Sequence, residues 1–253
     1  MAQGHDCEPM TYFSSLGGLG MIYLFKGDSD KNFELGRNLL EFGERHSDLR
    51  STVVGYICTS YGYYAGGDFA RGVECAQKAV ELSNDPLFTV WPKLVLATYY
   101  VQNEQIQEAG EILREIIPIC QSLGMDYIVT LAQGLYGAVL IAEGQFSRGL
   151  KMIQAGVRLF THNGRSLSLY FLEFSLAEIY FQMATRSQPL GFWLAAKNLG
   201  FLLKEAPFAR RKAEAYLNRI LQVGQEIGAG GFMQSQAALN LKRLRLHDKQ
   251  ETA

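Results

Sequence analysis

The chain alternates between segments in which apolar residues recur every three to four positions and short polar turns that interrupt them. This spacing places apolar side chains on one face of a helix, and no segment shows the period-two alternation of a strand. We therefore expect an all-α protein with about 12 helices. The expected ranges are 10–26, 29–47, 50–66, 69–84, 87–102, 105–123, 126–143, 146–163, 166–184, 190–206, 208–228 and 231–247.

Similar turns recur along the chain at a nearly constant spacing. Gly27-Asp28-Ser29, Gly67-Asp68-Phe69 and Gly144-Gln145-Phe146 each separate an apolar-periodic segment from an Ala/Leu-rich one. A degenerate copy is Glu104-Gln105-Ile106, and the run 176–180 places a fifth equivalent near residue 184. The spacings are then 40, 37, 40 and 40 residues, which indicates an internal structural repeat.

Each period predicts two antiparallel helices, and stacked pairs form a solenoid. Large residues occupy or neighbour the position about four residues before a turn, and small residues follow the turn, so that two backbones can approach while a large ring fills the gap. The large residues are Tyr23, Tyr63, Tyr100 and Tyr180, and the small ones Gly72, Ala109 and Gly149. This pattern resembles the tetratricopeptide repeat, although the period of 37–40 residues exceeds the usual value of about 34.

The organisation is expected to be continuous, because the chain has only six prolines and no linker-like tract. We expect a single domain over 1–253, with regular repeats over about 10–184 and irregular helices over 190–247, since the stretch 186–207 breaks the period. Ser187-Gln188-Pro189 marks a turn there. The ending, 246–253, reads as the start of another repeat, so we expect a fragment of a larger protein.

Composition narrows the choice of partners. Lys plus Arg is 24, Asp plus Glu is 25 and the net charge is −1, which argues against a nucleic-acid partner. The longest apolar run near the N-terminus, 16–25, is too short to span a membrane, and the first nine residues lack the pattern of a secretory signal. No CxxC pair occurs, which favours reduced thiols in a cytoplasmic protein. The cysteines are Cys7, Cys58, Cys75 and Cys120.

Candidate chemical groups are interpreted as structural or surface features, so no cofactor or metal is expected. The GGLG run at 17–20 follows no strand and carries no lysine, which favours close helix packing over a phosphate loop. The four histidines do not pair at ligand spacing, and four glutamates at helical spacing fit a solvated face. These residues are His5, His46, His162, His247, Glu104, Glu108, Glu111 and Glu115. The basic clusters 210–212 and 242–245 are expected on a solvated or partner-facing surface.

The concave face of the solenoid is the predicted partner-binding site, because the first helix of each pair lines the inner groove of such arrays. The residues expected to project there are Tyr61, Tyr64, Trp91, Thr98 and Gln102. Amphipathic rings are good anchors for a bound peptide or domain. The alternative is that these aromatic side chains belong to the core. Two further tyrosines, at positions 56 and 63, are expected to be buried between helices.

The C-terminal third carries a more specific resemblance. The strings FLLKEAPFARRKAEAYL at 201–217 and QEIGA at 225–229 resemble the C-terminal helical region of bacterial multidomain adenylate/guanylate cyclases that carry a signalling ATPase domain. The segments 123–125, 144–146 and 176–178 are similar to that region too. The resemblance implies a regulatory or sensory module. Neither a GxxxxGK[ST] loop nor a cyclase's pair of metal-binding aspartates is found, so the chain itself is not expected to be an enzyme.

Two functions remain open from the sequence. The first is a non-catalytic scaffold, the regulatory tail of a cyclase-type signalling protein, which binds a protein, a peptide or the parent protein's own domains; exposed repeat ends would also allow homo-oligomers. The second is a sensor that binds a small effector within the superhelix. A closed pocket lined by Tyr61, Tyr64 and Trp91 would favour the sensor.

Overall fold

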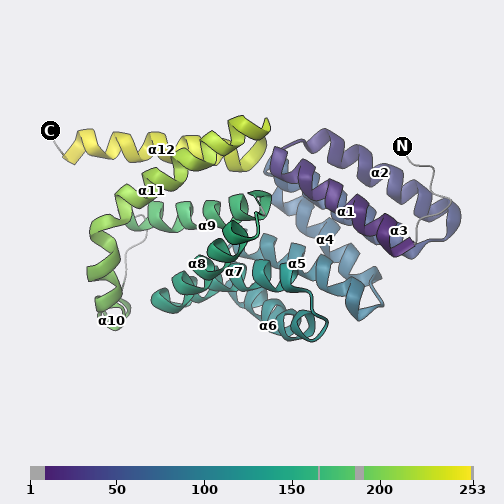
Figure 1. Ribbon diagram of the computed structural model, residues 1–253, viewed down its shortest axis with the longest axis horizontal. Coiled ribbons are helices and arrows are strands. Elements are labelled where there is room, and N and C mark those ends of the chain that lie inside the picture. The colour runs from purple at the N-terminus through teal and green to yellow at the C-terminus, as the bar shows by residue number, and fades with distance from the viewer. Residues whose placement is uncertain (1–8, 165, 186–190, 252–253) are drawn as a thin grey trace.

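The computed structural model describes residues 9–164, 166–185 and 191–251, which form twelve α-helices and no strand (Figure 1). The first nine agree with the predicted ranges to within two residues at either end. The helices are α1 (Pro9–Lys26), α2 (Ser29–His46), α3 (Leu49–Gly66), α4 (Phe69–Leu82), α5 (Pro86–Gln102), α6 (Ile106–Ser122), α7 (Asp126–Ala142), α8 (Phe146–His162), α9 (Ser166–Thr185), α10 (Phe192–Lys197), α11 (Leu199–Ile227) and α12 (Gly231–Glu251).

Neighbouring helices pack against each other in chain order, which confirms the predicted all-α solenoid of helix pairs. Each odd-numbered helix from α1 to α7 also contacts the next odd-numbered helix. The odd-numbered helices therefore form the inner layer, and the even-numbered helices from α2 to α8 lie outside it. The predicted turn Ser187-Gln188-Pro189 falls outside the described residues, as do the first eight positions with His5 and Cys7.

The recurring turns owe their shape to glycine and aspartate. Gly67 ends α3 with a φ of 80°, a left-handed conformation that glycine adopts without a steric penalty. The side chain of Asp68 then accepts a hydrogen bond from the backbone N–H of Arg71 at 3.2 Å, which caps the start of α4. Glu104, in the degenerate turn, has a φ of 60°. The degenerate turn is therefore a structural equivalent of the glycine turns, as its spacing predicts.

The predicted role of small residues is also confirmed at Gly72. A Cβ atom at this position would overlap the ring of Tyr99, whose hydroxyl donates a hydrogen bond to the carbonyl of Ser60. Tyr99 is 1% exposed. The absence of a side chain on α4 thus makes room for a buried aromatic residue of α5.

The prediction of separate helices over 190–206 and 208–228 is wrong, because α11 runs through Pro207. A proline inside a helix removes one backbone hydrogen bond, here to the carbonyl of Leu203. Leu203 is 70% exposed and Pro207 is exposed as well, so water can satisfy this carbonyl. Figure 1 shows α11 changing direction along its course, as expected for a proline-containing helix. The break in the chain comes earlier, at Asn198, between α10 and α11.

The C-terminal helices return to the N-terminal ones and close the inner layer. Helix α9 contacts α1, and α12 contacts both α3 and α9. The turn before α12 meets the turn after α1, where the N–H of Gly230 donates a hydrogen bond to the carbonyl of Lys26 at 2.7 Å (Figure 1). The ring of Phe232 packs edge-on against Tyr64 and Phe69. The inner helices thereby surround a common interior.

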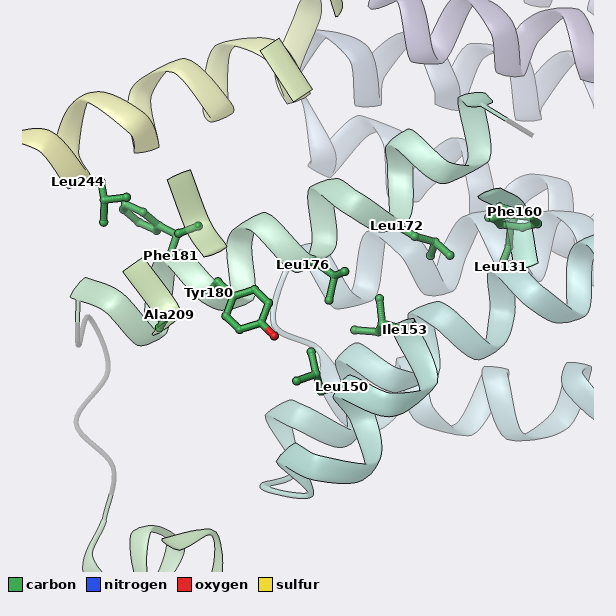
Figure 2. Packing of buried hydrophobic residues seen from close by; sticks show 11 residues of the cluster. Leu131, Leu150, Ile153, Phe160, Leu172, Leu176, Tyr180, Phe181, Ala209 and Leu244 are labelled. Carbon is green, nitrogen blue, oxygen red and sulfur yellow. The ribbon is translucent and has the colours of Figure 1, made fainter. Parts of the chain in front are cut away.

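Helix α9 is the element that joins the two halves of the structure. Figure 2 shows its side chains pointing both toward α7 and α8 and toward α11 and α12. Leu176 and Tyr180 of α9 are 0% exposed. The buried cluster around α9 consists of Leu131, Leu150, Ile153, Phe160, Leu172, Leu176, Tyr180, Phe181, Ala209, Ala213 and Leu244. Because it draws on five helices, this cluster fixes the position of the C-terminal pair.

Among the residues that the structure describes, no helix has both the length and the apolar character that a membrane span requires.

The closing contact predicts a specific effect of Gly27→Ala. Gly27 has a φ of 69°, and a Cβ atom there would overlap the carbonyl of Gly230. Gly228 has a similar φ of 64° but no atom within 4 Å of its Cβ position, so Gly228→Ala is the matched control. We expect Gly228→Ala to cost about 1 kcal/mol from backbone strain alone, and Gly27→Ala about 3 kcal/mol. Urea unfolding measures both; equal losses would show that the closing contact does not contribute to stability.

Candidate functional site

The inner helices enclose an apolar cavity of about 60 Å³. Each odd-numbered helix from α1 to α9 contributes to its wall, so the cavity lies inside the closed ring. The lining residues are Met21, Leu24, Phe25, Tyr61, Tyr64, Trp91, Leu94, Val95, Thr98, Tyr99, Leu131, Leu135 and Phe171.

Four of the five residues predicted on the concave face line this cavity together. Tyr61, Tyr64, Trp91 and Thr98 face it, whereas Gln102, the last residue of α5, is not part of the lining. Tyr61 is only 6% exposed and Tyr64 only 4%. The residues are thus on the inner face, where the ring buries Tyr61 and Tyr64 and leaves Trp91 and Thr98 partly exposed. Their role in binding a partner stays a prediction, and it requires that the ring open.

The two tyrosines expected to be buried between helices are instead partly exposed, so this expectation is wrong. Tyr63 packs edge-on against Phe33 and lies under the guanidinium of Arg71. Tyr56 lies under the ammonium of Lys78. These rings belong to the outer interface, which no further layer of helices covers. Because the inner layer is closed, Tyr61 and Tyr64 are more deeply buried than Tyr56 and Tyr63, the opposite of what the sequence predicts.

The polar groups at the cavity wall are engaged within the protein. The indole Nε1 of Trp91 donates a hydrogen bond to the hydroxyl of Tyr61 at 2.8 Å, and the hydroxyl of Thr98 donates to the carbonyl of Leu94 at 2.9 Å. Burial raises the pKa of Tyr61 and of Tyr64 well above the ordinary value for a phenol. Both phenols are therefore neutral at physiological pH, and the wall suits apolar rather than charged contents.

The volume of the cavity limits what it can hold. A water molecule takes about 30 Å³ of liquid, whereas sites for organic ligands usually measure about 300–1,000 Å³. A cavity of about 60 Å³ therefore admits only a very small apolar molecule in the closed state. A larger effector would need α1, α9 or α12 to move.

A polar contact between α9 and α12 lies beside the closed interior. The side-chain amide of Asn240 donates a hydrogen bond to Glu178 Oε1 at 2.6 Å, and Gln236 donates to Asn240 Oδ1 at 3.1 Å. Burial raises the pKa of Glu178 to about 7, and the hydrogen bond from Asn240 offsets this only in part. The charge of Glu178 therefore changes near neutral pH.

The basic cluster 210–212 has a more structural role than the predicted solvated or partner-facing surface. The ammonium of Lys212 contacts Glu205 Oε2 at 2.6 Å, and the hydroxyl of Tyr180 donates to the same oxygen at 3.0 Å. The guanidinium of Arg210 donates to the carbonyl of Leu244 at 2.5 Å. Only Arg211 of this cluster is exposed. Two of its three cations thus hold α11 against itself, α9 and α12.

The other candidate groups occupy separate places. Gly20, in the GGLG run, lies in close contact with Cys58 of α3, which supports the packing interpretation. Cys58, Cys75 and Cys120 are free thiols, and burial raises the pKa of Cys58 to about 12. Within the described ranges, no three His, Cys, Asp or Glu side chains gather into a potential metal site. The predicted solvated face is confirmed by the exposure of Glu104, Glu108, Glu111 and Glu115.

Sequence analysis missed a group of exposed apolar residues on α10 and the start of α11. Its residues, with their exposed fractions, are Phe192 (77%), Trp193 (83%), Leu199 (55%), Leu203 (70%) and Phe208 (49%). We call this set the α10–α11 surface. The available signal was an adjacent Phe-Trp pair followed by leucines four residues apart. The break in the repeat over 186–207 hides that signal, because no repeat position indicates what these residues face.

The segment that carries this surface is anchored on its other side. The side-chain amide of Asn198 donates a hydrogen bond to the carbonyl of Gly144 at 2.9 Å. The ring of Phe201 packs against Phe146, with centroids 5.6 Å apart. The start of α11 thereby rests on the turn between α7 and α8. The exposed side chains are presented on a supported helix rather than on a loop.

Comparisons with known proteins give no family assignment. No protein-family profile matches the chain, and a search of curated proteins gave no significant match.

The contact between α9 and α12 predicts a pH dependence of stability. Because the pKa of Glu178 in the folded state, about 7, lies above the ordinary value of 4.5, the folded state binds this proton more tightly than the unfolded state. The resulting stabilisation is complete below pH 4.5 and is lost as the pH rises through about 7. Glu178→Gln keeps an acceptor for Asn240 and removes the charge. We expect it to be more stable than the wild type at pH 8 by up to about 3 kcal/mol.

Urea unfolding at pH 5 and pH 8 measures this difference, and the exposed Glu108→Gln on α6 is the matched control. The wild type and the control should lose stability between the two pH values, whereas Glu178→Gln should lose less. Parallel losses in all three proteins would contradict the assignment of this titration to Glu178.

Proposed function

We propose that this chain is a non-catalytic protein-interaction scaffold that uses its α10–α11 surface to bind a protein partner. The observation that carries the proposal is the concentration of exposed apolar side chains there. Of the twelve large hydrophobic residues exposed in the described part of the chain, five lie within the 17 positions from Phe192 to Phe208. Scattered apolar residues are normal on a protein surface, but a concentration of them is typical of an interaction site.

The residue types and their support fit this role. Trp193 and Phe192 contact each other at 5.6 Å between ring centroids, and Trp is among the residues that contribute most to protein interfaces. The anchoring of Asn198 and Phe201 on the α7–α8 turn limits the conformational entropy that binding would cost. A supported helix with exposed rings is therefore a preorganised docking element.

The proposed context is a regulatory module of a bacterial signalling protein, which the resemblance to the cyclase tail implies. In that context the partner would be a separate protein or another domain of the parent chain. The free thiols of Cys58, Cys75 and Cys120 fit a reducing compartment such as the cytoplasm. The buried carboxylates of Glu205 and Glu173 are paired with Lys212 and Arg219, which supports a structural rather than a catalytic use of these groups.

The scaffold proposal predicts capture of a protein that depends on Trp193. Immobilised chain should retain a specific protein from a lysate of the source organism, and Trp193→Ser should retain less than a fifth as much, because an exposed aromatic anchor contributes about 1–2 kcal/mol to binding. Leu123→Ser, which changes an exposed leucine at the end of α6, is the matched control. Quantitative mass spectrometry measures the retained protein. Equal retention by all variants, or turnover of a nucleotide by the purified chain, would overturn the proposal.

A second candidate function is the sensing of a small apolar effector, and the cavity favours it. The cavity is lined by Tyr61, Tyr64 and Trp91 and touches five helices of the ring. A ligand that bound there would therefore stabilise the closed arrangement as a whole.

Xenon is a suitable probe, since the cavity is small and apolar. We expect xenon under pressure to raise the melting temperature by a few degrees at saturation. Val95→Ile should abolish this effect because the added methylene group fills the cavity, whereas Val129→Ile, which lies outside the lining, should retain it. Calorimetry in a pressurised cell measures the shift. A xenon effect that survives in Val95→Ile would place the binding elsewhere.

A further inference from the structure

We propose that the uncovered first half of α11 binds an acidic amphipathic helix of the partner protein, which lies along this half of α11. This inference rests on the proposed function as a scaffold and names the chemistry of its partner. It follows from an apolar stripe on α11, from the extent of α12 along that stripe, and from the charges beside the uncovered part.

The stripe has the spacing of a helix-packing seam. Its positions alternate between steps of four and three residues along the whole of α11, the pattern that keeps side chains on one face toward a second helix. They are Leu199, Leu203, Ala206, Arg210, Ala213, Leu217, Ile220 and Gly224. The spacing of a packing seam is thus present on both sides of Pro207, with Arg210 as its one charged member.

Helices α9 and α12 cover the second half of this stripe. Ala213, Leu217 and Ile220 are each 0% exposed, and Leu217 and Ile220 pack with side chains of both α9 and α12. Arg210 still contacts α12, because its guanidinium bonds to the carbonyl of Leu244. Beyond this point Leu203 and Leu199 are 70% and 55% exposed. The same seam is therefore occupied on one side of Arg210 and open on the other.

The open half is the start of α11, from Leu199 to Ala206, which spans about two helical turns. Asn198 and Phe201 hold this start on its other face, so it is available for a helix without rearrangement of the array.

The charges beside the open half specify an acidic partner. Lys197, Lys204 and Arg211 are exposed, and none of them forms an ion pair with a described residue at 4.0 Å or less. Between 191 and 213 the sequence contains one acid, Glu205, which is buried and bonded to Lys212. In a chain with a net charge of −1, this concentration of positive charge is local. Carboxylates on the flank of a bound helix would pair with it.

Two other occupants fit the observations less well. In a symmetric pair of chains that used this face, Lys197, Lys204 and Arg211 of both copies would come together and repel. A lipid surface would attract the cations, but it does not use the four-and-three spacing that continues the contact with α12. A partner helix satisfies both the spacing and the charge.

Designed peptides test the inference directly. The probe is a labelled helical peptide of about 18 residues with leucines at alternating steps of three and four and glutamates on its flanks. The matched peptide has lysine in place of every glutamate. We expect the acidic peptide to bind with saturation and at least about ten-fold more tightly than the basic one, and to weaken as salt rises from about 50 to 500 mM. Fluorescence anisotropy measures both affinities.

Substitutions in the chain show where the acidic peptide binds. Leu203→Ser and the double variant K204E/R211E should each weaken the acidic peptide at least about ten-fold. Leu123→Ser and Lys151→Glu, both exposed and distant in sequence from α11, should bind as the wild type does. Circular dichroism and melting temperature check that every variant is folded; all the changed side chains are exposed.

Each outcome supports or contradicts the binding of an acidic helix. Equal binding of the two peptides, or binding that survives in K204E/R211E, overturns the inference. So does binding to phosphatidylserine vesicles without binding to the acidic peptide, or a dimer that Leu203→Ser dissociates. If the lysate experiment retains a protein that depends on Trp193 but not on Leu203 or Lys204, the scaffold stands and the acidic helix is wrong. If the peptide binds but no protein is retained, the scaffold proposal fails by itself.

Discussion

The structure depends on the contact by which its C-terminal pair closes the inner layer. A helical-repeat solenoid is held mainly by contacts between adjacent repeats, so its ends have no reason to meet. Here the N–H of Gly230 bonds to the carbonyl of Lys26 across about 200 residues of sequence, and Phe232 of α12 packs on Tyr64 of α3. Because this closure encloses the inner face, it buries side chains that an open array would present to a partner. The proposed interaction surface therefore lies at the edge of the array.

The carboxylates at the contacts of α9 with α11 and α12 differ in the pH at which they lose their charge. Burial by itself would raise the pKa of Glu205, yet the hydrogen bonds from Lys212 and Tyr180 keep that pKa below its ordinary value. Burial raises the pKa of Glu173, although its ion pair with Arg219 of α11 at 3.0 Å opposes this. Glu178, which faces α12, accepts a hydrogen bond from the neutral amide of Asn240, and burial raises its pKa to about 7. The contact through Glu205 thus keeps its charges over a wide pH range, whereas the contact of Glu178 with α12 weakens as the pH rises.

The sequence was sufficient for features that are decided locally. Turn glycines, capping aspartates and apolar periodicity fix the first nine helices, and each acts over a few residues. The predicted helix boundary at Pro207 was wrong, because a proline interrupts a helix only where the freed carbonyl stays unsatisfied. The packing of α11 decides whether water reaches this carbonyl. Tyr61 and Tyr64 were placed on the correct face, but their burial follows from the meeting of α9 and α12 with the N-terminal helices. That meeting depends on the summed rotation of all repeats, which no single motif encodes. The α10–α11 surface was not predicted, because in a sequence an exposed apolar residue cannot be distinguished from a core residue. Only the fold shows which apolar side chains are covered.

The position of Arg210 explains how partner binding and ring closure can coexist. A helix bound to Leu199, Leu203 and Ala206 would end where α11 meets Leu244 of α12, because the guanidinium of Arg210 is already bonded to the carbonyl of Leu244. Such a partner would not displace α12, and the cavity lined by Tyr61 and Trp91 would stay closed. A helix that extended past Arg210 would have to compete with the buried contacts of Leu217 and Ile220, which are 0% exposed. Burial of two such side chains is worth about 3–6 kcal/mol, so the shorter docking mode is favoured. The geometry therefore supports a scaffold that binds at its edge without unfolding its interior.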